Sequence, residues 1–277
     1  MPAERIAHNL AFINWTVLTT LAVGSFAVVV LGRLRTDATR GFLGFTALCS
    51  AVFAVLAYLS DAALPAAAVD AAFRPDAAFE LPRRVLLLVF AGLGLAYAVA
   101  LFAGRRAPAL GLAGAAAGVA VLVLAALGWG GGFPTAVPLA IQLAVLAAAT
   151  GGVFAAMILG HWYLVTPRLP EAPLILFARL LLAVVSLQLA LFFAWQAVGA
   201  GAGAGPFAAL VGPWALFVWL RLLVGLVFPL VISWAAVQTA RTRSMESATG
   251  LLYIDLGSIA AGTILASGLY FGAGLLA

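Results

Sequence analysis

Long apolar stretches alternate with short polar breaks along the whole chain. Each stretch is about as long as the ~20 residues that a helix needs to cross a bilayer. Pro, Gly and charged residues mark the breaks, as in the loop that holds Pro65, Pro75 and Pro82. The pattern predicts about eight transmembrane helices, over residues 8–32, 41–64, 84–103, 108–128, 135–164, 173–198, 207–240 and 248–275.

The composition narrows the class of protein further. Of the 277 residues, 66% are hydrophobic and only 8% are charged, and the mean hydropathy is +1.19. A soluble globular domain has a charged fraction of about 25%, so this chain must be solvated by lipid. We therefore expect an all-α integral membrane protein that forms a single polytopic membrane domain over residues 1–277.

The arginines predict an orientation in the membrane. All basic residues are Arg, and they stand singly or in pairs at helix ends, which excludes the basic stripe of a nucleic-acid-binding protein. We expect the chain to lie in the inner (cytoplasmic) membrane of the cell. Because cytoplasmic loops collect Arg, we expect both termini on the non-cytoplasmic side, and no cleaved signal peptide. The expected cytoplasmic side holds Arg33, Arg35, Arg40, Arg105, Arg106, Arg168, Arg179, Arg241 and Arg243; the other side holds Arg5, Arg74, Arg83 and Arg84.

A faint internal similarity suggests two halves, 1–130 and 131–277. Residues 84–106 and 221–243 align without gaps, with Arg at both ends of each segment. Two four-helix repeats in the same orientation would explain the match. Chance similarity among Leu, Ala and Val strings would explain it equally well.

Polar residues inside the spans are the candidate functional residues, because a charge at the bilayer centre costs at least about 2.5–3.5 kcal/mol. Near the outer face the sequence has a polar group that could line a cleft for a polar head group. The competing interpretation is hydrogen bonding between helices, worth about 1 kcal/mol per contact. The outer candidates are His8, Asn9, Asn14, Asp61 and Arg221.

A second polar group is expected at the inner face. A His with a carboxylate and a Tyr nearby suits proton transfer, whereas an aromatic belt and charged anchors would explain the same residues without chemistry. Arg221 and Asp255 are expected near opposite faces, so they should not pair with each other. The proton-transfer candidates are His161, Tyr163, Glu246 and Asp255.

Several cofactors are not expected. The chain has no Lys, which excludes a retinal Schiff base, and His8 and His161 are predicted on opposite sides of the membrane, which excludes a haem held by both. The single cysteine, Cys49, lies inside a predicted span, so no metal site is expected. No tightly bound cofactor is therefore expected.

The layout resembles the membrane subunits of the NrfD/PsrC type, on the basis of eight spans in two four-helix bundles and of polar residues in the first helix. The resemblance implies a subunit of an electron-transfer complex that anchors partner subunits and exchanges electrons with quinol, with His8, Asn9 and Asn14 as the matching positions and Asp61 as their carboxylate partner. The alternatives are a secondary transporter with two repeats, of which Pro229 in the seventh span is the one sign, and a structural or assembly protein.

Overall fold

The structure, a computed structural model, describes residues 1–67, 71–166, 169–199 and 205–277, and this part of the chain is helical without strands. Asp70 and Arg168 therefore lie outside the described residues. The elements are α1 (Pro2–His8), α2 (Leu10–Arg35), α3 (Arg40–Ala62), η1 (Ala77–Phe79), α4 (Glu80–Phe102), α5 (Pro108–Trp129), α6 (Phe133–Val165), α7 (Ala172–Val198), η2 (Ala208–Leu210), α8 (Ala215–Leu222), the π-helical segment η3 (Leu223–Val227), α9 (Phe228–Arg241) and α10 (Met245–Ala273).

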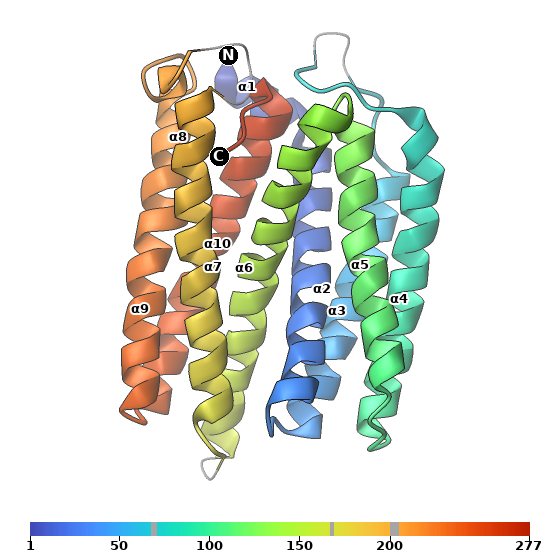
Figure 1. Cartoon of the computed structure of the whole chain (residues 1–277), viewed down its shortest axis with the longest axis vertical. Helices are drawn as coiled ribbons and strands as arrows, with labels where there is room; N and C mark the ends of the chain where they lie inside the picture. Colours follow the sequence, from blue (N-terminus) through green and yellow to red (C-terminus); the bar gives the residue numbers. More distant parts are fainter. Residues whose placement is uncertain (68–70, 167–168, 200–204) are drawn as a thin grey trace.

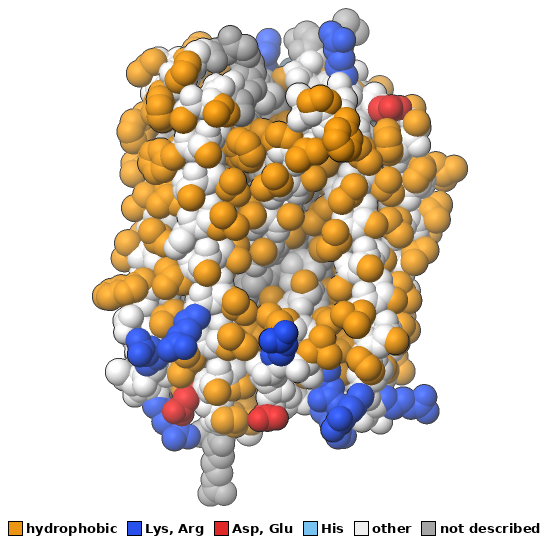
Figure 2. Space-filling view, viewed as in Figure 1, with side chains coloured by type: hydrophobic (Ala, Val, Ile, Leu, Met, Phe, Trp, Pro, Cys, Tyr) orange, Lys and Arg blue, Asp and Glu red, His pale blue; other side chains and the backbone are white. Residues whose placement is uncertain are grey.

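Eight stretches are long and apolar enough to cross a membrane, as the sequence predicted. Two of them are composite: η1 continues into α4, and α8, η3 and α9 form one span over Ala215–Arg241. The flanks of the bundle are apolar while arginines gather at its ends (Figure 2), which is the surface of a helical bundle in lipid.

Two predicted helix starts were wrong, for opposite reasons. The seventh span was expected from residue 207 but begins at Ala215, because Gly212 and Pro213 interrupt the helix and residues 207–214 form turns and the short helix η2 instead. The third span was expected from residue 84, but it begins at Ala77 with η1, and its α-helix, α4, begins at Glu80. Pro82 lies in its first turn, where a missing N–H removes no helical hydrogen bond.

The helices pack into two rings of four with the same order of neighbours. In the first ring, α2 packs on α3, α3 on α4, α4 on α5, and α5 back on α2; in the second, α6, α7, α9 and α10 follow the same circuit. The rings meet through α2 on α6, with α10 on α2 and α5 on α6 at its sides (Figure 1). This arrangement fits the two halves suggested above, while the sequence repeat itself stays a prediction.

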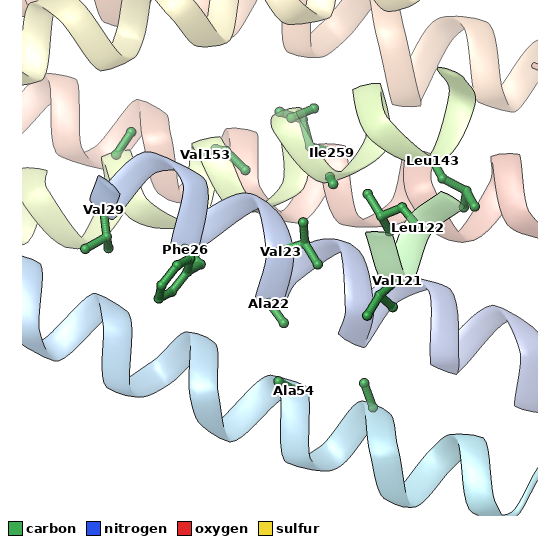
Figure 3. Packing of buried hydrophobic residues seen from close by; sticks show 14 of the residues in the cluster. Ala22, Val23, Phe26, Val29, Ala54, Val121, Leu122, Leu143, Val153 and Ile259 are labelled. Carbon is green, nitrogen blue, oxygen red and sulfur yellow. The ribbon is translucent and has the colours of Figure 1, made fainter. Parts of the chain in front are cut away.

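Glycines allow the closest approach between the two rings. A Cβ added to Gly24 of α2 would overlap the backbone oxygen of Ala147, and one added to Gly151 of α6 would overlap the backbone of α2. Around this crossing, apolar side chains of both rings form one core (Figure 3), including Phe26, Val153 and Ile259. Small residues at such crossings let backbones touch, which drives helix association in lipid.

Both chain termini lie at the same end of the bundle (Figure 1), which we call the termini end. The opposite end carries the turns after α2, α4, α6 and α9, and we call it the arginine-rich end. That the termini share one end follows from the eight spans; which end faces the cytoplasm stays a prediction.

Candidate functional site

A pocket at the termini end brings together two of the predicted ligand-binding residues, His8 and Asn9. The short helix α1 ends at His8, and Asn9 forms the break before α2, so both side chains lie where the chain turns into the membrane. The pocket measures about 240 Å³. Its lining, the His8 pocket below, is Arg5, His8, Asn9, Phe12, Pro65, Ala66, Ala67, Ala71, Ala72, Phe271 and Gly272.

The polar groups of the His8 pocket keep hydrogen-bonding capacity. One Nδ2 hydrogen of Asn9 goes to the backbone oxygen of Arg5, with the two heavy atoms 2.8 Å apart, which leaves the second hydrogen and the carbonyl oxygen of the amide. The exposed imidazole of His8 makes no hydrogen bond to any residue that the structure describes. A flat polar molecule in the pocket would therefore meet one amide hydrogen, one amide oxygen and an imidazole that bond to no described residue.

Phe12 and Phe271, two rings of an aromatic cluster, form the inner wall of the pocket. The ring of Phe12 lies 4.9 Å from Phe73, 5.3 Å from Phe271 and 5.9 Å from Trp129, measured between ring centroids. Phe73 and Trp129 also contact Phe271, mostly edge to face. These rings come from α2, α5, α10 and the loop before α4, so the pocket wall is fixed by packing among four parts of the chain.

Behind this wall lies a buried ion cluster formed by Asp61, Arg83 and Arg84. Asp61 was expected to face the outer cleft, but its carboxylate accepts from Nε of Arg83 at 2.6 Å and from Nε of Arg84 at 3.2 Å. The Arg83 guanidinium also lies 4.6 Å from the ring centre of Trp129 and 5.5 Å from that of Trp15. Asp61 is thus occupied by the two arginines and does not line the His8 pocket.

Sequence reasoning missed the role of Arg83. It was counted as a surface charge, yet only 2% of it is exposed. Its Nη1 and the Nε1 of Trp15 are buried without a hydrogen-bond partner among the described residues. The available signal was the pairing of Arg83 and Arg84 with Asp61, the one carboxylate at the end of the preceding span.

Asn14 also lies away from the His8 pocket. Its side chain is exposed on the flank of α2, and its Nδ2 donates to the hydroxyl of Ser60 on α3 at 3.2 Å. This contact is the interhelical hydrogen bond of the competing interpretation.

Arg221, the fifth ligand candidate, lies in the second ring. Its guanidinium donates to the backbone oxygens of Gly225 at 3.0 Å and Ala277 at 3.3 Å, and to Oε1 of Gln188 at 3.1 Å. The space beside it is only about 10 Å³, too small for any ligand larger than one water. The outer candidates therefore separate into three places, and only His8 and Asn9 share a pocket.

A break in the seventh span explains the position of Arg221. Pro229 has no N–H, so backbone oxygens one turn before it lose a donor. The π-helical segment η3 lies there, and its oxygens receive donors from side chains instead: Arg221 binds Gly225, and the hydroxyl of Ser258 on α10 donates to Val224. Arg221 thus satisfies the backbone of a broken helix.

Asp255 lies on the same seam between α9 and α10, closer to the arginine-rich end. It is fully buried, and its Oδ2 accepts from the hydroxyl of Ser233 at 2.6 Å, while Oδ1 has no partner among the described residues. Arg221 lies beside Gly262, seven residues along α10 from Asp255, which corresponds to about 10 Å. The prediction that the two do not pair is confirmed, because Arg221 and Asp255 bind other partners.

The predicted inner cluster is only partly assembled. Tyr163 and Glu246 line one pocket of about 370 Å³ together with Arg243, and the Tyr163 hydroxyl donates to the backbone oxygen of Pro170. His161 is exposed and is not part of this lining, and Asp255 lies deeper in α10.

Neither metal-binding groups nor related proteins point to a further site among the described residues. Within the described ranges, no group of three or more His, Cys, Asp or Glu residues could hold a metal ion. In comparisons with known proteins, the chain matched no family model, no curated protein and no solved structure.

Proposed function

We propose that this multi-pass membrane protein is the quinone-binding subunit of an electron-transfer complex. The observation that supports the proposal is the His8 pocket, where an imidazole and an amide with free hydrogen-bonding capacity face two phenyl rings, Phe12 and Phe271. A quinone is a flat ring with two carbonyl oxygens, so it needs a donor at its edge and apolar surfaces at its faces.

The chemistry would divide between this chain and a partner. On oxidation, a quinol releases two protons and two electrons. The electrons would go to a metal centre of the partner subunit; one proton would go to a ring nitrogen of His8, and the second to the solvent at the exposed edge of the pocket. Asn9 would orient the ring through its free amide hydrogen. The expected partners are thus the lipid bilayer and other subunits of the complex.

Paired substitutions along α1 and α2 test this proposal. His8→Leu and Asn9→Leu should each weaken binding of a short-chain quinol to the purified chain by about tenfold, because each removes a hydrogen bond to the ring. Asn14→Leu is the matched control, since Asn14 is also a polar residue at this end but bonds to Ser60. Binding that survives His8→Leu and Asn9→Leu unchanged would contradict the quinone site.

The break in the seventh span favours a second candidate, a proton-coupled transporter. Transporter spans are often interrupted near the midplane, and here η3 and Pro229 interrupt a span beside the buried carboxylate of Asp255. The purified chain alone, reconstituted in liposomes, distinguishes the two functions. A transporter would dissipate an imposed proton gradient in the presence of its substrate, and Asp255→Asn would abolish this flux, whereas a quinone-binding subunit would be inactive without its partner.

A further inference from the structure

The arginine-rich end of the first ring contains an open pocket that none of the candidate residues above explains. It measures about 540 Å³ and lies between the turn that joins α2 to α3 and the turn that joins α4 to α5. Three of its lining side chains are arginines, and one is acidic. The lining, which we call the phosphate pocket for the reasons given next, is Arg33, Leu34, Arg35, Thr36, Asp37, Arg106 and Pro108.

The arginines of the phosphate pocket have no protein anion to bind. Arg33, Arg35 and Arg106 form no hydrogen bond or ion pair with any residue that the structure describes, and Nε of Arg33 is buried without a partner. With Asp37 as the one acidic side chain, the lining keeps a charge of about +2. The side chains of Arg35 and Arg106 are exposed and that of Arg33 is half-buried, so their accessible guanidinium nitrogens can take an acceptor from outside the chain.

The helix that begins at the pocket adds to the positive potential. Helix α5 starts at Pro108, and no side chain caps its first turn, so the positive end of the helix dipole lies next to Arg106. Pro108 lines the pocket but has no N–H, so the helix start adds positive potential and no donor of Pro108 itself.

Arg243, at the same end of the second ring, differs in this respect. It forms an ion pair with Glu171, at 3.4 Å between Nε and the carboxylate, and it shares its pocket with Glu246. The charge of Arg243 is thus balanced within the protein. An arginine that serves only to orient the chain in the membrane needs no pocket.

We propose that the phosphate pocket binds the phosphate group of an anionic phospholipid. The pocket lies at the helix ends, at the depth of lipid head groups, and its wall continues into apolar surface: Leu34 is 51% exposed and Leu112, one turn into α5, is 55% exposed. A bound lipid would place its phosphate on the arginines and its acyl chains along these leucines. A soluble phosphate compound would gain nothing from the leucines.

The test uses the purified full chain and native mass spectrometry. Phosphatidylglycerol should bind more tightly than zwitterionic phosphatidylcholine, and R33Q/R106Q should lower the affinity for phosphatidylglycerol by about tenfold or more, because two charge-assisted contacts are lost. R105Q is the matched control: Arg105 stands in the same turn but does not line the pocket. Neither variant removes a hydrogen bond between described residues, and a thermal unfolding curve checks that both fold.

Three outcomes would overturn the proposal. Equal loss of affinity in R105Q and R33Q/R106Q would show that general surface charge, not the pocket, attracts the lipid. Equal binding of phosphatidylglycerol and phosphatidylcholine would show that the net charge of the head group is not recognised, so the pocket does not select an anionic phospholipid. Displacement of phosphatidylglycerol by a modest excess of inorganic phosphate would show that the site serves a soluble phosphate compound and not a lipid.

Discussion

Two arginines, Arg83 in α4 and Arg221 in α8, are equally buried near the termini end, yet their charges are compensated by different chemistry. They belong to the corresponding third spans of the two rings, and each is 2% exposed. Arg83 has a carboxylate partner, Asp61, and two indole rings. Arg221 has no side-chain carboxylate as a partner among the described residues; it binds the backbone oxygen of Gly225, an oxygen of Ala277, the last residue of the sequence, and Gln188.

The difference shows that a buried arginine is not by itself a ligand site. Arg83 holds the first ring together by joining α3 and α4 through Asp61, whereas Arg221 replaces hydrogen bonds that Pro229 removes from its own span. A buried charge with one side-chain carboxylate as its partner is left uncompensated when that carboxylate is removed. The donors of Arg221 go to three separate residues, so no single side-chain substitution removes all its acceptors.

The largest expected effect is at Asp61. Asp61→Asn leaves Arg83 buried without a counter-charge and should lower the free energy of unfolding by about 3–5 kcal/mol. Thermal unfolding in detergent measures this change. Arg84→Gln is the control and should cost less than about 1 kcal/mol, because the Arg84 side chain is 35% exposed. A small effect of Asp61→Asn would mean that the indole rings alone compensate Arg83.

An intermediate effect is expected at Arg221. Arg221→Met leaves the Gly225 oxygen without a donor and should cost about 1–3 kcal/mol. In a Pro229→Ala background, the restored N–H can satisfy the backbone of this turn, so the same substitution should cost less. A double-mutant cycle from unfolding measurements gives the coupling. Equal costs of Arg221→Met in both backgrounds would contradict the compensation of the broken helix.

The smallest effect is expected at Asp255. Asp255→Asn is the same change as Asp61→Asn, but Asp255 accepts from a hydroxyl and has no cation as a partner among the described residues. Asp255→Asn should therefore change the free energy of unfolding by less than about 1 kcal/mol. The same unfolding measurement compares the two Asp→Asn variants directly. Comparable losses at both positions would show that Asp255 has a charged partner that the contacts above do not include.

The sequence alone predicted the spans well because hydropathy is a local property. A stretch of about 20 apolar residues identifies a span without any information from the rest of the chain. The start at Ala215 was missed because Gly212 and Pro213 stand inside an apolar run that hydropathy alone treats as continuous. Helix periodicity also cannot show which helix faces which. Asp61 was therefore assigned to a cleft, although its partners lie on α4.

The candidate site was predictable only in part, for the same reason. His8 and Asn9 are neighbours in sequence, so their shared pocket follows from local structure. Phe271 lies on α10, far along the chain from His8, and Gln188, a partner of Arg221, lies on α7; no pattern in one sequence links them. The π-helical segment η3 was signalled by Pro229, but the donors that complete it were not.

The backbone contact between Gly24 and Gly151 has a consequence for biogenesis. Helices enter the membrane in chain order during synthesis, so α2 to α5 are inserted before α6 exists. Until α6 is made, the surface of α2 at Gly24 lacks the helix that packs against it in the folded protein. The first four spans are thus inserted before this contact can form, and it forms only once the fifth span is made.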